Sequence, residues 1–200
     1  MIIHNVIQGS DDWHKIRSTK FTASNFYKLF AKPETKTYQN FINEVVFARL
    51  TGELEEGYTN SYMQRGIEME SEAIMNYEFE TFNKVHRCGF IEHSEWIGCS
   101  PDGLIGEDGM IQVKCPKATT LMDYYGSQIP KNYMYQIQGE LFVSGRKWSD
   151  FYVYHPKLKP QVIRVVRDEQ MITDIICLTD LAVEEAKKRI KQFKKYIKEN

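Results

Sequence analysis

Hydrophobic residues in the first part of the chain recur at the spacing of an α-helix. This pattern predicts a short helix over residues 11–17 and a second helix that begins after Thr22 and ends before Pro33. A further helical pattern leads to a polar, acidic connection over residues 51–60, and a long amphipathic helix is predicted over residues 62–82. We therefore expect the N-terminal part of the chain to be helical.

The pattern changes near residue 84 to short runs that are typical of β-strands. Strands are predicted over residues 85–91, 96–99, 103–105, 110–114, 151–155 and 162–166. Two of them form a hairpin around a turn at residues 106–109. Further helices are predicted over residues 118–125 and 133–143 and from Glu169 onward. This order of elements predicts one α/β domain over residues 1–200, with a mixed central β-sheet flanked by α-helices.

The composition is that of an ordinary globular protein, with 42% hydrophobic and 26% charged residues among 200. No apolar run approaches the roughly 18 residues that a membrane span needs, and the N-terminus lacks the pattern of a signal peptide. The four cysteines form no Cys-x-x-Cys pair, and the five histidines lack the spacing of a helical metal pair. We therefore expect no membrane association, no zinc or iron–sulfur site, and reduced thiols in the cytoplasm.

Candidate chemistry concentrates in the predicted hairpin. Side chains alternate along a strand, so Gln112 and Lys114 share one face while Val113 points to the core. The hairpin brings Asp102 close to that face, which makes an oxygen cluster for a hard cation with an ammonium group beside it. Mg²⁺ held by carboxylates neutralises a phosphodiester and lowers the pKa of bound water. A lysine near the nucleophile can orient it or stabilise negative charge in the transition state.

This arrangement resembles the PD-(D/E)xK nuclease signature, and three further motifs extend the resemblance. They are QGSDDWHKIR at residues 8–17 with FTAS at 21–24, GIEME at 66–70, and YQIQ at 135–138. In this order they resemble the motifs of the YqaJ-like viral recombinase family, the phage lambda-type exonucleases. Each motif alone is weak, but together they span most of the chain and are specific.

The resemblance implies a restriction-endonuclease-like core and a set of site residues. The catalytic residues would be Asp102, Gln112, Lys114 and Glu70. The metal ligands would be Asp102, Gln112, Glu70 and the carbonyl of Val113. The 5′-phosphate and the DNA would be bound by Arg17, Ser24, Ser100 and Gln136. Glu92 falls near a further acidic position of the family.

The implied function is a Mg²⁺-dependent 5′-to-3′ exonuclease of double-stranded DNA that leaves a 3′ single-stranded overhang for phage-type homologous recombination. Two Mg²⁺ ions per active site are expected, with Mn²⁺ as a substitute. The implied partners are duplex DNA with a free 5′ end, a single-strand annealing protein, and two further copies of the chain in a ring-shaped homotrimer. Such a protein is phage- or prophage-encoded and acts in the cytoplasm of a bacterial host.

Position 112 departs from the family pattern, which has Glu where this chain has Gln. Either Gln112 is natural and Asp102 and Glu70 carry the charge, or a Glu→Gln change traps an uncut DNA complex. The alternatives to the leading hypothesis are another PD-(D/E)xK DNA endonuclease and a catalytically impaired DNA-end-binding protein.

Several of these residues also have plainer interpretations. Arg17 can form a surface ion pair with Asp11 or Asp12, and Ser24 and Ser100 can be helix-start and turn residues. Gln136 can be a buried hydrogen-bonding residue. Asp102 alone is a common turn residue and Lys114 alone a common exposed lysine, and Trp13 is expected to anchor the core.

The formal net charge of −1 argues against a uniformly basic DNA-binding surface. The charges are unevenly distributed, however. Residues 51–80 hold eight Glu against one Arg, whereas residues 181–200 hold seven Lys or Arg against three Glu. A nuclease needs carboxylates for metal ions as well as cations for phosphates. The balance therefore predicts DNA contacts that concentrate at a DNA end and along a limited basic track.

Overall fold

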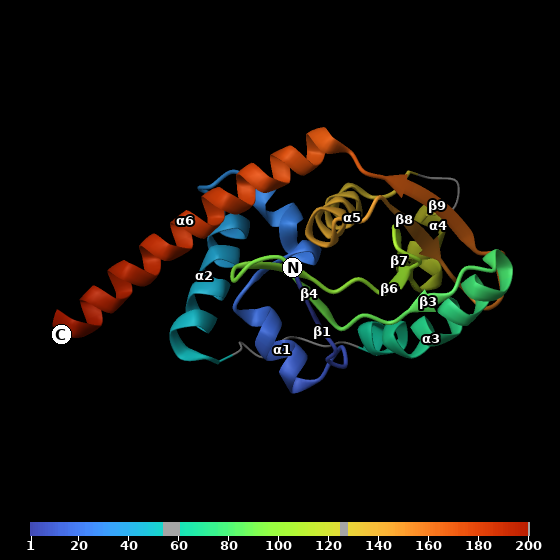
Figure 1. Ribbon diagram of the computed structural model, residues 1–200, viewed down its shortest axis with the longest axis horizontal. Coiled ribbons are helices and arrows are strands. Elements are labelled where there is room, and N and C mark those ends of the chain that lie inside the picture. The colour runs from blue at the N-terminus through green and yellow to red at the C-terminus, as the bar shows by residue number, and fades with distance from the viewer. Residues whose placement is uncertain (54–60, 125–127, 200) are drawn as a thin grey trace.

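The computed structural model describes residues 1–53, 61–124 and 128–199 (Figure 1). The helices are α1 (Asp11–Ser18), the 3₁₀ helix η1 (Ala23–Phe30), α2 (Lys36–Thr51), α3 (Ser61–Thr81), α4 (Ala118–Tyr124), α5 (Lys131–Ser144) and α6 (Glu169–Glu199). The strands are β1 (Ile2–His4), β2 (Phe21–Thr22), β3 (Val85–His86), β4 (Phe90–Glu92), β5 (Ile97–Cys99), β6 (Gly103–Ile105), β7 (Gly109–Lys114), β8 (Trp148–Val153) and β9 (Gln161–Val166). The predicted acidic connection lies largely outside the described residues, because residues 54–60 are not among them. Tyr125, the predicted end of one helix, also lies outside them.

Local signals explain where the N-terminal helices begin and end. The Ser10 hydroxyl accepts a hydrogen bond of 3.3 Å from the Trp13 amide and so caps α1. Thr35 caps α2 in the same way, and Gly52 ends that helix with a φ of 73°, a left-handed conformation that glycine adopts without strain. The segment after Thr22 is helical as predicted, but its turns are those of a 3₁₀ helix.

The α/β fold class is confirmed, and the strands divide between two mixed sheets. One sheet has the order β1-β4-β5-β2 and the other has the order β3-β6-β7-β8-β9. The predicted hairpin is β6 and β7, with Gly103 opposite Ile111. The adjacent strands β7 and β8 run parallel to each other. Strand β6 is antiparallel to β7, and β9 is antiparallel to β8.

The strand predicted over residues 85–91 is divided, because β3 belongs to one sheet and β4 to the other. The break contains Gly89, where an added Cβ would collide with the backbone oxygen of Val6. The side-chain amide of Gln8 also donates a hydrogen bond of 2.8 Å to the carbonyl oxygen of Cys88. The N-terminal segment thus packs against this break, and the indole nitrogen of Trp13 donates a hydrogen bond of 3.2 Å to the carbonyl oxygen of Gly89.

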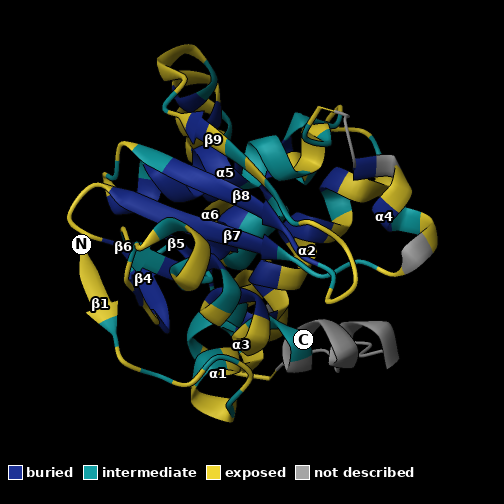
Figure 2. Cartoon of the chain, turned by 90° about the vertical axis from the view of Figure 1, so that its right-hand side faces the viewer, coloured by how far each residue is buried: buried dark blue, intermediate teal, exposed yellow. Residues whose placement is uncertain are grey.

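Helices cover both faces of the five-stranded sheet, so β7 and β8 are buried along most of their length (Figure 2). On one face, Ala73 and Tyr77 of α3 pack in a cluster with Ile111 and Val113. On the other face, side chains of α4 and α5 pack in a cluster with Met110. The alternation predicted for β7 is therefore confirmed, and its even-numbered side chains face α5.

A third cluster joins η1, α2 and α6 to the four-stranded sheet through Phe26, Ile42, Ile91 and Ala182. Helix α6 packs against α2 and then extends beyond the rest of the chain to the C-terminus (Figure 1). Within the described ranges, no helix has the length and apolar character that crossing a membrane requires.

Candidate active site

Asp102 lies immediately before β6, opposite the point where β7 continues past its partner strand. Its Oδ2 atom accepts a hydrogen bond from the side-chain amide of Gln112 and another, of 2.7 Å, from the backbone amide of Val113. Burial raises the pKa of Asp102 to about 6; the charge of Lys114 opposes this shift and that of Glu70 adds to it. The structure therefore brings together Asp102, Gln112, Val113 and Lys114, with Glu70 near enough to act on Asp102 electrostatically.

Helix α5 closes one side of this cluster. The Nε2 atom of Gln136 donates hydrogen bonds to Oε1 of Gln112, at 2.7 Å, and to Oε1 of Glu140, at 2.9 Å. The Nζ atom of Lys114 lies 4.8 Å from the ring centroid of Tyr133, also on α5. Gln136, predicted as a DNA-binding residue, thus contacts the predicted metal ligand Gln112.

Glu70 approaches from α3 on the opposite face of the sheet. Its carboxylate forms an ion pair with Arg87, whose guanidinium also donates a hydrogen bond of 3.1 Å to the Ser71 hydroxyl. No motif or spacing in the sequence indicates Arg87. Glu70 raises the pKa of Asp102, whereas the positive charge of Arg87 lowers it. The ion pair therefore weakens the electrostatic effect of Glu70 on the Asp102 cluster.

The donor atoms of this cluster suit a hard divalent cation. Asp102 and Glu70 supply carboxylate oxygens, and the carbonyl of Val113 faces the same side as its amide, which donates to Asp102. Gln112, however, turns its NH₂ group toward Asp102 and its oxygen toward Gln136, so its amide must rotate before the oxygen can bind a cation there. No group of three or more His, Cys, Asp or Glu side chains able to hold a metal ion occurs in the part of the chain that the structure describes. The site combines two carboxylates with an amide.

Trp13 organises three of the four predicted DNA-binding residues. The Arg17 guanidinium stacks on the Trp13 ring at 4.2 Å from the ring centroid. The indole nitrogen of Trp13 donates a hydrogen bond of 2.9 Å to the Ser100 hydroxyl. Arg17 in turn donates a hydrogen bond of 3.3 Å to the Ser24 hydroxyl. Burial lowers the pKa of Arg17 to about 10, so the guanidinium remains a cation at neutral pH. Arg17, Ser24 and Ser100 therefore form a cationic cluster, and Ser100 lies two positions before Asp102 in the chain.

The alternative ion pair between Arg17 and the acidic residues of α1 does not match this arrangement. Asp12 lies 3.9 Å from the ammonium group of Lys15, one turn along the same exposed side of the helix. Arg17 points instead to Trp13 and Ser24. Trp13 is only partly buried, and it acts as the link between these side chains rather than as a core residue alone.

Sequence reasoning missed Glu140, which is 1% exposed on the inner face of α5. Burial and the charge of Asp102 together raise its pKa to about 8. The single sequence signal was its position four residues after Gln136, which places both side chains on one helix face. A carboxylate this deeply buried beside Gln136 and Asp102 belongs to the same cluster.

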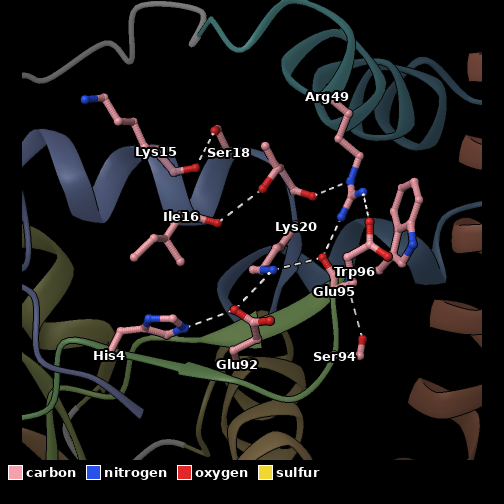
Figure 3. A network of polar contacts seen from close by, with 11 residues as sticks. His4, Lys15, Ile16, Ser18, Lys20, Arg49, Glu92, Ser94, Glu95 and Trp96 are labelled. Atoms are coloured by element: carbon pink, nitrogen blue, oxygen red, sulfur yellow. Dashed lines mark hydrogen bonds and ion pairs between the residues drawn. The ribbon is translucent and has the colours of Figure 1, made fainter. Parts of the chain in front are cut away.

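Glu92 takes part in a separate network (Figure 3). Its carboxylate pairs with the imidazole of His4 at 3.0 Å and with the ammonium group of Lys20 at 3.4 Å. Lys20 also donates a hydrogen bond of 2.9 Å to the backbone oxygen of Glu95, whose side chain pairs with Arg49. These contacts join the segment after α1 and helix α2 to the four-stranded sheet.

Comparisons with known proteins agree with this architecture. An alkaline exonuclease from Laribacter hongkongensis, LHK-Exo, is 31% identical, covers 95% of this chain and 99% of its own, and superimposes with a TM-score of 0.88. A structure of the same enzyme in complex with dAMP matches equally well. A phage related exonuclease from Haemophilus somnus 129PT, at 17% identity, covers 87% of this chain and 96% of its own with a TM-score of 0.67, which supports the fold alone. No curated protein sequence matches the chain.

A family model, the YqaJ-like viral recombinase domain, matches residues 12–147. The match covers well over half of the chain and includes the hairpin, Gln136 and the Trp13 cluster. The fold, the residues gathered around Asp102 and this match agree. The chain belongs to the YqaJ-like viral recombinase family of nucleases.

Proposed function

We propose that the protein is a Mg²⁺-dependent 5′-to-3′ exonuclease that degrades one strand of duplex DNA and leaves a 3′ single-stranded overhang for phage-type recombination. The observation that carries the proposal is the cationic cluster of Arg17, Ser24 and Ser100, of which Ser100 lies two positions before Asp102 in the chain. A cation that binds a terminal phosphate beside a hydrolytic centre places the first phosphodiester at that centre. The alkaline exonuclease from Laribacter hongkongensis binds dAMP, a mononucleotide of the kind that such hydrolysis releases.

Each site residue has a role in this proposal. Asp102, Glu70, Gln112 and the Val113 carbonyl would hold divalent cations, with two Mg²⁺ per site or Mn²⁺ in their place. A bound cation would neutralise the phosphodiester and lower the pKa of the attacking water. Lys114 would orient that water or stabilise the negative charge that develops on the phosphate. Gln136 would support Gln112 at the boundary between this centre and the phosphate cluster.

The direct test uses purified protein with Mg²⁺ or Mn²⁺ on three duplex substrates: linear with 5′-phosphates, linear with 5′-hydroxyls, and covalently closed circles. We expect release of mononucleotides and growth of 3′ overhangs from the linear 5′-phosphorylated DNA, with the circle intact. Cleavage of the circle would instead identify an endonuclease of the same fold.

Arg17→Ala is expected to remove the preference for a 5′-phosphate. Because a hydrogen bond to a charged group contributes about 1.5–3 kcal/mol, the rate on 5′-phosphorylated DNA should fall roughly 10- to 100-fold. The rate on 5′-hydroxyl DNA should change little, so the ratio of the two rates measures the effect. Lys15→Ala, an exposed position on the same helix, is the matched control. Equal losses on both substrates would contradict a phosphate-binding role.

Gln112→Glu is expected to raise Mg²⁺-dependent nuclease activity and to lower the Mg²⁺ concentration that gives half-maximal rate. The substitution adds a negative charge and an oxygen that needs no rotation to reach a cation. Without metal, the new carboxylate loses the hydrogen bond to Asp102 and repels it, so the metal-free variant should melt at a lower temperature. A Mg²⁺ titration of the rate beside Gln128→Glu, an exposed control, measures the effect. Unchanged or lower activity would count against the site assignment.

A second candidate function is DNA-end binding without catalysis. One observation favours it: Gln112 presents NH₂ hydrogens rather than oxygen to Asp102, so the carboxyl oxygen has hydrogen-bond donors without a metal ion. An absence of turnover with both Mg²⁺ and Mn²⁺, together with retained binding of 5′-phosphorylated ends, would support this function over the exonuclease.

We also propose that residues 1–200 form one nuclease domain that assembles as a homotrimer around DNA and works with a single-strand annealing protein. The cytoplasm of a bacterial host, from a phage or prophage gene, is the proposed location. Membership of a viral recombinase family supports these proposals. Sedimentation with and without duplex DNA measures the oligomer's mass.

A further inference from the structure

Glu140 is a buried carboxylate whose hydrogen bonds are incomplete. The residue lies on α5, one turn after Gln136, and only 1% of it is exposed. Its Oε1 atom accepts one hydrogen bond from Gln136, while Oε2 is buried and has no hydrogen-bond partner. A buried polar atom without a partner destabilises the folded chain, so its presence here indicates a role other than stability.

The surroundings of Glu140 connect it to the centre of the site. Gln136 donates to both Glu140 and Gln112, and Gln112 donates to Asp102, so hydrogen bonds run unbroken from α5 to the hairpin. Asp102, Lys114 and Arg17 also act on Glu140 electrostatically. Glu140 therefore lies between the Asp102 cluster and the cationic cluster, within the field of both.

Structural support alone does not explain a carboxylate at this position. A glutamine would accept the same hydrogen bond from Gln136 and would carry no charge into the interior. No ion pair with Glu140 occurs among the residues that the structure describes, and with a pKa of about 8 the side chain is largely protonated at neutral pH until a cation binds nearby and favours its ionised form. What a carboxyl group adds over an amide here is the ability to ionise beside a bound cation and to offer a free acceptor, one side chain behind Gln112.

Gln112 lacks both of these properties as a metal ligand. Its amide oxygen carries no full charge, and in this structure the oxygen is held by Gln136 while the NH₂ group faces Asp102. When the amide rotates to present its oxygen to a cation, its NH₂ group turns toward α5 and needs an acceptor there. Glu140, whose Oε2 has no partner, is also on α5 and is connected to Gln112 through Gln136.

We propose that Glu140 is a positioning residue of the metal centre: it supplies from behind Gln112 the negative charge that the amide lacks, and it accepts the amide hydrogens once the oxygen of Gln112 faces the cation. The proposal rests on the proposed metal-dependent function. Asp102 and Glu70 supply two negative charges to the centre. In this proposal the third charge, which a glutamate at position 112 would place on β7, comes from Glu140 on α5.

The test exchanges the two side chains and measures metal binding without DNA or turnover. Mn²⁺ binding is measured by calorimetry for the wild-type protein, Glu140→Gln, and the double variant Gln112→Glu/Glu140→Gln. We expect Glu140→Gln to bind Mn²⁺ roughly 10- to 100-fold more weakly, the usual effect of losing a group that supports a ligand. The double variant, which keeps the total charge, should return to wild-type affinity or better. Glu44→Gln, an exposed position on α2, is the matched control.

Thermal melting in EDTA separates this role from a structural one. Because burial disfavours the ionised form of Glu140, a neutral glutamine should leave the melting temperature of the metal-free variant equal to or above that of the wild type, while its Mn²⁺ affinity falls. An unchanged Mn²⁺ affinity in Glu140→Gln would overturn the proposal. So would an affinity that falls together with the melting temperature and is not restored in the double variant. A wild-type protein that binds no Mn²⁺ and cleaves no DNA would overturn the proposed function itself. Wild-type turnover with an unaffected Glu140→Gln would overturn only the role of Glu140.

Discussion

Asp102→Asn is expected to abolish metal binding and DNA cleavage while the fold stays intact. Both hydrogen bonds that reach this side chain, from Gln112 and from the Val113 amide, end on the same oxygen. An asparagine keeps one side-chain oxygen and can accept both. What it loses is the charge, and a metal ion supplies several kcal/mol of transition-state stabilisation, which corresponds to a rate loss of roughly 10²- to 10³-fold or more.

The same substitution should stabilise the metal-free protein. The pKa of Asp102 is raised to about 6 from an ordinary value of 3.8, so its ionisation is less favourable in the folded chain than in the unfolded chain. The stability that the protonated carboxyl contributes is present below pH 4 and is lost as the pH rises through 6. In EDTA, the melting temperature of Asp102→Asn should exceed that of the wild type by roughly 6–12 °C at pH 8, because the shift of the pKa corresponds to about 3 kcal/mol. The difference should shrink toward pH 4.

Three measurements check this prediction: Mn²⁺ calorimetry, mononucleotide release, and melting in EDTA at pH 4, 6 and 8. Asp108→Asn is the matched control, because Asp108 lies in the turn of the same hairpin and forms an exposed ion pair with Lys147. Retained cleavage in Asp102→Asn, or a melting temperature below that of the wild type at pH 8, would show that Asp102 is a turn residue.

Sequence-local features were the most predictable part of the fold. The hairpin of β6 and β7 could be predicted because its turn and its alternation lie within a dozen residues. The end of α2 at Gly52 depends on one residue's left-handed conformation. The division of the strand predicted over residues 85–91 could not be predicted in this way. It depends on Val6 packing against Gly89, a contact between segments that are far apart along the chain.

In the candidate site, too, contacts within one segment could be predicted and contacts between distant segments could not. Strand alternation placed Gln112 and Lys114 on one face, and the hairpin placed Asp102 beside them. Motif resemblance, not periodicity, indicated Arg17 and Gln136. Glu140 was missed because it is joined to β7 only through Gln136 of its own helix, and a buried glutamate looks like any helix residue in the sequence. The sequence pattern also did not indicate that Arg87 forms an ion pair with Glu70.

Lys114→Met is expected to reduce the rate of cleavage without weakening metal binding. Methionine keeps most of the side chain's length and its packing against Tyr133. It removes the ammonium group, whose charge favours the ionised forms of Asp102 and Glu140 and opposes a cation beside them. Loss of a positioned acid or base typically lowers the rate by about 10²- to 10⁴-fold. Single-turnover rates at saturating Mn²⁺, with calorimetry in parallel, measure both effects.

Lys114→Arg then distinguishes the two roles that the geometry allows. Arginine keeps the positive charge but does not give up its proton at any accessible pH. If Lys114 stabilises charge, the arginine variant should recover part of the rate that methionine loses, and the pH profile should keep its shape. If Lys114 transfers a proton, both variants should be equally slow. Lys157→Met, an exposed position between β8 and β9, is the control for a lost surface charge. A methionine variant within about tenfold of wild-type rate would leave Lys114 as an ordinary strand lysine packed on Tyr133, because a general acid or base contributes more than that.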